Sequence, residues 1–232
     1  MACQTLCIYG DSGTGKSTAL RNLNPENTFI ISTTGKPLPF RAWRKKYIPF
    51  TINKETKEVS GNYYVSSNWE AILKILKIIN TKMPNITTVV VDDTQYIMSY
   101  EFVDRATEVG YGKFSELAQH LMTILRYAEQ MREDCTMCFL THCENTGTEI
   151  DPKYVIKTIG KLLSEKVTLE GLFTYIFFTK VEEGDDGRMQ YKLVTNNDGQ
   201  CLAKTPMGMF EELEIDNDLA QILQIIKEYN EE

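Results

Sequence analysis

One stretch near the N-terminus combines glycines, a lysine and a serine at a spacing that suits phosphate binding. Residues 10–17 fit the pattern G-x-x-x-x-G-K-[ST] without a mismatch. The glycines allow a tight turn, so that backbone N–H groups and the start of the next helix can surround phosphate oxygens. Lys16 would reach the β- and γ-phosphates of ATP, and the Ser17 hydroxyl would ligate Mg²⁺. The expected nucleotide-binding residues of this P-loop are Asp11, Ser12, Gly13, Thr14, Gly15, Lys16, Ser17 and Thr18.

Two consecutive acids, Asp92 and Asp93, follow the apolar run at 89–91. Mg²⁺ prefers hard oxygen ligands, and parallel strands bring their carboxyl ends to one edge of a sheet. We therefore expect Asp92 to bind the metal together with Ser17. Asp93 has two open roles: a catalytic residue that positions the attacking water, or a cap for the next helix.

His142 stands at the end of another apolar run, at 136–140. A polar residue there can contact the γ-phosphate and report hydrolysis to the following segment, so we include His142 among the candidate catalytic residues. The alternative is a structural histidine whose hydrogen bonds are satisfied locally.

Cysteines and basic residues give two further patterns. Cys135, Cys138, His142 and Cys143 could form a metal site, but a straight strand spreads them over both faces and no second pair has zinc-finger spacing. Cations interleave with aromatic residues at 41–47, and lysines recur at 153, 157, 161 and 166. A solvated basic face is the alternative for both basic segments.

The elements that must position these residues alternate between strands and amphipathic helices. Apolar strands are expected at 5–9, 28–31, 87–91, 136–140, 174–178 and 189–195. Helices are expected after the P-loop, from Asn68 as N-cap, and at 94–109, 114–132, near 160–170 and at 216–230. Residues 47–66 predict a hairpin insertion in which 62–65 pairs back with 47–52, and 143–160 predicts a mobile loop. The expected fold class is α/β: a mainly parallel sheet with helices on both faces and an antiparallel C-terminal extension, in one domain spanning 1–232.

Composition limits the class of protein. The chain has 232 residues and a net charge of −7, which argues against indiscriminate nucleic-acid binding by the whole surface. No apolar run approaches a membrane span, and no signal-peptide pattern is evident, so we expect a cytoplasmic protein with no membrane partner.

The order of these motifs resembles the RecA-type core of P-loop NTPases. It is most similar to the small phage and prophage ATP-binding proteins of Sak type, which are linked to single-strand annealing and recombination. The stretches that carry this resemblance are 35–40, 91–96, 157–161, 169–173 and 203–210.

The resemblance implies a head-to-tail ring or filament with ATP and Mg²⁺ at the subunit interface, possible recombination or single-strand-binding partner proteins, and single-stranded DNA near Lys157 and Lys161. Tyr154 could add base stacking there. Lys204 matches the basic residues that reach a neighbour's phosphates, with a surface lysine as the alternative. RecA cores usually carry a catalytic glutamate after the second strand, whereas this chain has no acid at 31–35.

Other function classes fit less well. A small-molecule or nucleoside kinase would need a lid with clustered arginines, for which Arg41 and Arg44 are the only candidates. A GTPase would need Asn-Lys-x-Asp after a strand, and an ABC ATPase a Ser-Gly-Gly signature; the chain has neither. A non-hydrolysing ATP-dependent scaffold stays open.

Overall fold

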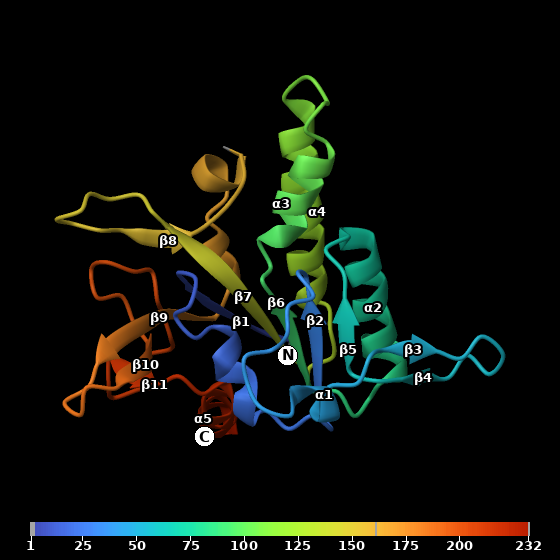
Figure 1. Ribbon diagram of the computed structural model, residues 1–232, viewed down its shortest axis with the longest axis horizontal. Coiled ribbons are helices and arrows are strands. Elements are labelled where there is room, and N and C mark those ends of the chain that lie inside the picture. The colour runs from blue at the N-terminus through green and yellow to red at the C-terminus, as the bar shows by residue number, and fades with distance from the viewer. Residues whose placement is uncertain (1–2, 161, 232) are drawn as a thin grey trace.

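The computed structural model describes residues 3–160 and 162–231, and these build a mixed sheet covered by helices (Figure 1). Its strand order is β11-β10-β9-β1-β7-β6-β2-β5, with β8 paired to β7 beside this path. The strands are β1 (Gln4–Gly10), β2 (Thr28–Ser32), β5 (Tyr63–Val65), β6 (Thr88–Asp92), β7 (Thr136–Asn145), β8 (Tyr154–Ile156), β9 (Tyr175–Glu183), β10 (Met189–Val194) and β11 (Glu214–Asp216).

The central strands run parallel, whereas β10 is antiparallel to both of its neighbours, β9 and the edge strand β11. Parallel strands must bury both faces, which explains their nearly unbroken apolar sequences. The expected fold class is therefore confirmed, including the antiparallel C-terminal extension.

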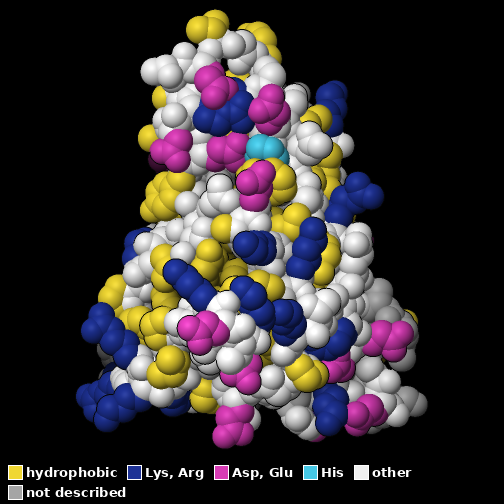
Figure 2. Space-filling view, turned by 90° about the vertical axis from the view of Figure 1, so that its right-hand side faces the viewer, with side chains coloured by type: hydrophobic (Ala, Val, Ile, Leu, Met, Phe, Trp, Pro, Cys, Tyr) yellow, Lys and Arg dark blue, Asp and Glu magenta, His cyan; other side chains and the backbone are white. Residues whose placement is uncertain are grey.

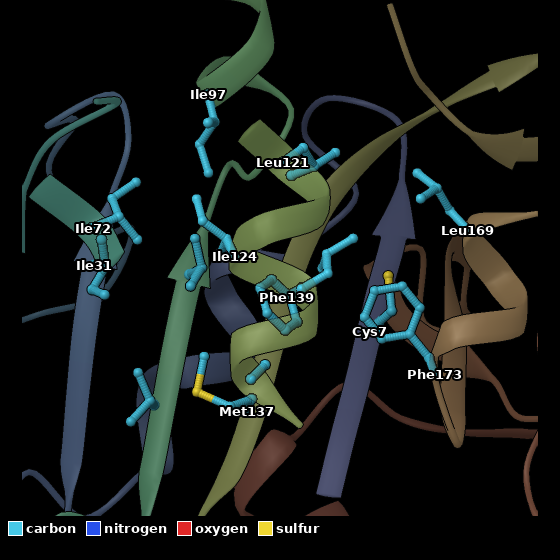
Figure 3. Packing of buried hydrophobic residues seen from close by; sticks show 14 of the residues in the cluster. Cys7, Ile31, Ile72, Ile97, Leu121, Ile124, Met137, Phe139, Leu169 and Phe173 are labelled. Atoms are coloured by element: carbon cyan, nitrogen blue, oxygen red, sulfur yellow. The ribbon is translucent and has the colours of Figure 1, made fainter. Parts of the chain in front are cut away.

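Helices cover both faces of the sheet. On one face lie α2 (Trp69–Lys82), α3 (Tyr96–Asp104) and α4 (Gly112–Ala128), and on the other lie the 3-10 helix η1 (Ser17–Asn22) and α5 (Leu219–Glu231). Alternate residues of β1 point to opposite faces: Cys7 faces the α2–α4 side and Ile8 the α5 side. Figure 3 shows the first of these cores, with Leu121 and Ile124 of α4 above Met137 and Phe139 of β7.

Helix boundaries follow local chemistry. The Asn68 side chain accepts a hydrogen bond from the Ala71 N–H at 2.9 Å, so the expected N-cap of α2 is confirmed. The segment after the P-loop forms only the six-residue η1. In place of the helix expected near 160–170 are a short π-helix, η2 (Leu162–Lys166), and a 3-10 helix, η3 (Leu169–Leu172).

Two segments differ from expectation. The small hairpin consists of β3 (Thr51–Ile52) and β4 (Val59–Ser60), flanked by the four-residue α1 (Trp43–Lys46), while β5 pairs in parallel with β2 as the edge of the main sheet. Residues 62–65 therefore do not form an antiparallel hairpin with 47–52. Tyr63 forms an isolated parallel bridge with Pro49 and exchanges backbone hydrogen bonds with Ile48 and Phe50. The segment expected to be a loop at 143–160 carries the β7–β8 hairpin.

The α3–α4 pair rises above the sheet as a helical projection (Figure 1). Within the described residues, no helix has both the length and the apolar character to cross a membrane.

Candidate nucleotide-binding site

The P-loop connects the carboxyl end of β1 to η1. Gly13 and Gly15 have φ angles of 81° and 94°, in the region that side chains rarely adopt. A Cβ at Gly13 would meet no atom within 4 Å, so the loop is open on that side. A Cβ at Gly15 would collide with Asn217, whose amide donates to the Gly15 carbonyl at 2.9 Å. The loop is thus free where phosphates would approach and packed where α5 begins.

Lys16 is buried, with 6% of its surface exposed. Its ammonium donates hydrogen bonds to the carbonyls of Gly10 at 2.9 Å and Asp11 at 2.6 Å. Burial lowers its pKa, while the negative charges of Asp93 and Asp92 oppose this effect. The cation therefore lies within the loop that would receive a triphosphate.

Strand β7 lies between β1 and β6. Ser17, which follows β1 through the P-loop, therefore meets Asp92, the last residue of β6, across the end of β7. The Ser17 hydroxyl donates to both carboxylate oxygens of Asp92, at 2.9 and 3.0 Å. Burial and the charge of Asp93 raise the pKa of Asp92 to about 7, although the Ser17 hydrogen bond lowers it. This pair of hard oxygen donors beside Lys16 fits the ligand preference of Mg²⁺.

The remaining P-loop side chains brace the loop. Thr14 donates to the Asp11 carbonyl at 2.7 Å and shares a 2.5 Å hydrogen bond with Thr179 of β9. The Asp11 carboxylate accepts from the Cys143 thiol at 3.3 Å, and burial raises the pKa of that thiol to about 12. Ser12 is exposed. The loop is therefore anchored to β7 and β9.

Asp93 contacts a different set of residues from Asp92: Thr34, Lys36 and His142. Its φ of 62° is rare for a residue other than glycine, and strain of this kind gathers at functional sites. The Thr34 hydroxyl donates to its carboxylate at 3.2 Å, while His142 Nε2 lies 3.5 Å and Lys36 Nζ 3.9 Å from it. Burial raises the pKa of Asp93, but His142 and Lys36 outweigh it and the pKa is lowered. Asp93 does not cap α3, which begins at Tyr96 without a side-chain cap.

The contacts of His142 connect Asp93 to the β7–β8 hairpin. Its ring meets Tyr96 edge-on at 6.2 Å, and its carbonyl accepts from the Lys157 N–H at 2.9 Å. Thr34 and Lys36 were not among the predicted site residues, although they follow β2 in the same way that Asp93 follows β6.

A pocket of 490 Å³ lies beside η1, lined by Thr18, Arg21, Gln190, Tyr191, Lys192, Asp216 and Asn217. Arg21 supports it by donating to the Asn217 carbonyl and by pairing with Asp218 at 3.8 Å. An exposed aromatic ring, Tyr191, thus adjoins Thr18 at the end of the P-loop, where a nucleotide base could stack. A larger hollow of 870 Å³ under the β3–β4 hairpin contains no P-loop residue.

The other predicted residues lie apart from this cluster. Lys157 is exposed directly after β8, and the Tyr154 ring stacks on Phe178 at 5.0 Å. Lys204 is exposed in a segment that pairs with Ile176, and within the described residues no hydrogen bond or ion pair joins it to residues 11–18. Lys161 lies outside the described residues.

The zinc alternative finds no support in the geometry. Cys135 and Cys143 face the α2–α4 core, whereas Cys138 faces the α5 core. Among residues 3–160 and 162–231, no three His, Cys, Asp or Glu side chains gather in a metal-binding group.

Comparison with known proteins agrees with this geometry. No curated protein matches the chain. A family model described as an AAA domain matches residues 2–207, which is most of the chain. The chain therefore belongs to the AAA domain family of ATP-binding P-loop NTPases.

Proposed function

We propose that this protein is a Mg²⁺-dependent ATPase of RecA type that couples ATP turnover to the binding of single-stranded DNA. The observation that carries the ATPase part is the Ser17–Asp92 contact at 2.9 and 3.0 Å beside Lys16. A hydroxyl at the start of η1 and a carboxylate at the carboxyl end of β6, next to a phosphate-binding lysine, are the groups that P-loop chemistry needs.

Each residue of the site has a distinct task in this proposal. Mg²⁺ would be held by Ser17 and Asp92 and would neutralise charge on the β- and γ-phosphates. Lys16 exchanges its carbonyl partners for phosphate oxygens. Asp93 stays ionised because its pKa is lowered, and its carboxylate accepts a hydrogen bond from the water that adds to the γ-phosphorus. ADP and inorganic phosphate are the products.

His142 would contact the γ-phosphate and transmit its loss to the hairpin. The support for this role is its position between Asp93 and the backbone N–H of Lys157. Lys157 and Lys161 would contact DNA phosphates. Lys204 would contact the phosphates bound to the neighbouring subunit in a head-to-tail oligomer. The support for this role is that Lys204 is exposed and, within the described residues, makes no contact with its own P-loop.

The Sak-type resemblance suggests a biological setting for this activity. Annealing or recombination of phage DNA needs a protein that holds single strands while ATP is bound or hydrolysed. Single-strand-binding or recombination proteins are the partners that such a task would require.

The test is ATP turnover with and without an oligo-dT strand. We expect stimulation by DNA, no turnover by Lys16→Ala, and reduced stimulation in Lys157→Ala but not in the control Lys227→Ala, an exposed lysine of α5. Turnover only with a small acceptor would identify a kinase instead, and tight ATP binding without turnover would identify a scaffold.

A further inference from the structure

Positive charge is concentrated in one segment of this acidic chain. Residues 27–53 contain no Asp or Glu but carry Lys36, Arg41, Arg44, Lys45 and Lys46, whereas the whole protein has a net charge of −7. The segment leaves the carboxyl end of β2, contributes Lys36 to the Asp93 cluster, and then forms α1. Lys36 is paired there, so the four later cations are the ones that remain available.

These four residues, which we call the α1 basic surface, are all exposed. Within the described structure, none of Arg41, Arg44, Lys45 and Lys46 forms an ion pair. Four like charges repel one another unless an anion offsets them. Figure 2, which faces the side with α2 and the β3–β4 hairpin, shows several Lys and Arg side chains across the middle and lower part of this face, with Asp and Glu side chains among them.

The surface is also held in shape. The guanidinium of Arg44 lies over the ring of Trp43 at 5.3 Å, and Trp43 packs on Tyr63 of β5 at 5.3 Å. Tyr47 closes the segment as a buried residue. A cation fixed on an aromatic ring that is itself partly exposed is the combination that single-strand binders use for phosphates and bases.

We propose that the α1 basic surface binds the phosphate backbone of single-stranded nucleic acid. This inference rests on the proposed DNA-binding function and adds to it a second contact surface, separate from Lys157 on the β7–β8 hairpin.

Two other anionic partners fit less well. A membrane surface would call for exposed apolar side chains among the cations, but Ile48 is the only large one exposed within the described residues 33–50. A second copy could offer its acidic β9–β11 edge. However, five acids near that edge are already paired with cations of their own chain: Glu182, Asp186, Glu214, Asp216 and Asp218.

The experiment measures oligo-dT binding to the full chain by fluorescence anisotropy over a range of salt concentrations. The variant is Arg44→Ala/Lys45→Ala/Lys46→Ala. The control Lys74→Ala/Lys82→Ala/Lys227→Ala removes the same charge from exposed positions on α2 and α5. The logarithm of the binding constant falls with the logarithm of the salt concentration, and each phosphate contact contributes about −0.7 to this slope. We therefore expect the slope to be shallower by about 2 in the first variant and unchanged in the control.

The outcomes separate this inference from the proposed function. Equal slopes in the two triple variants, with tight binding by the wild type, would overturn the α1 basic surface and leave the DNA-binding function standing. No oligo-dT binding by the wild type would overturn both. A loss of self-association in sedimentation, with DNA affinity unchanged, would assign the surface to a second copy and refute our inference. Circular dichroism of both variants tests that they are folded, and Lys45→Glu/Lys46→Glu, which keeps the Arg44–Trp43 contact, gives an independent measure of the same slope.

Discussion

Asp92 offers the sharpest test of the site, because a charged carboxylate at this buried position destabilises the folded protein. The side chain is buried, and burial together with the charge of Asp93 raises its pKa from 3.8 to about 7. Asp92→Asn keeps the shape and one oxygen acceptor for Ser17 but removes the charge. We therefore expect the variant to be more stable than the wild type when neither nucleotide nor Mg²⁺ is present.

The magnitude follows from the shift. A rise of about 3 pKa units, at 1.36 kcal/mol each, makes ionised Asp92 cost about 4 kcal/mol relative to the unfolded chain. The asparagine loses one Ser17 contact and gains an amide that lacks a partner, which costs about 1–2 kcal/mol. The expected net gain at pH 8 is about 2 kcal/mol, or about 4–8 °C in Tm for a chain of this size.

The raised pKa also fixes the direction in which stability changes with pH. Because the folded pKa is raised, the folded protein binds more protons than the unfolded chain between pH values of about 4 and 7, and wild-type stability falls as the pH rises through this window. The advantage of Asp92→Asn should therefore grow by about 2 kcal/mol from pH 5.5 to pH 8. Urea unfolding at both pH values measures this difference.

The same substitution at the next residue, Asp93→Asn, is the matched control for Asp92→Asn. Its pKa is lowered, so its charge contributes stability that is present above the unfolded pKa and lost as the pH falls through the folded pKa. Asp93→Asn should then lose stability at pH 8, where Asp92→Asn gains it. If Asp92→Asn proves less stable than the wild type at pH 8, or if its advantage is the same at both pH values, the reasoning about the buried carboxylate is refuted.

Two further predictions concern the same loop. A proton on Asp92 competes with the metal, so the affinity for Mg·ATP, followed by calorimetry, should fall about tenfold from pH 8 to pH 6, and a flat profile would contradict the assignment of Asp92. Gly15→Ala should lower the thermal stability more than Gly13→Ala, because only a Cβ at position 15 collides with Asn217. Gly13→Ala should instead weaken ATP binding, because its methyl group fills the open side of the loop. Equal Tm values for the two variants would be evidence against this packing.

Sequence patterns predicted the parts of the site that lie next to a strand end. The glycine spacing at 10–17 and the acid after the apolar run at 89–91 depend on local order alone, and both P-loop and Asp92 lie at the same edge of the sheet. Parallel strands bring their carboxyl ends together whatever their order, so the Ser17–Asp92 contact could be expected without knowledge of which strand lies between them.

Contacts between distant segments could not be predicted in this way. Residues 63–65 suit either a hairpin return or a parallel edge strand, and pairing with β2 decides between them. The bond from Asn217 to Gly15 joins segments 202 residues apart, and no local pattern signals it. The polar stretch 144–151 predicts a loop, but residues 143–145 pair with β8 and extend β7 instead.

The two consecutive acids show why their roles can differ. Along a strand, neighbouring side chains point to opposite sides, and the left-handed backbone at Asp93 turns its carboxylate further, toward Thr34 and His142. Ser32 of β2 pairs with Asp92 of β6, so the residues just past these two strands meet. Asp93 therefore supplies a carboxylate beside the end of β2, where RecA-type cores usually carry a glutamate and this chain has threonines. The pKa is raised for Asp92 and lowered for Asp93, so their environments separate the two carboxylates. This separation is what our proposal of two distinct roles requires: a metal ligand at Asp92, and at Asp93 a charged hydrogen-bond acceptor that positions water.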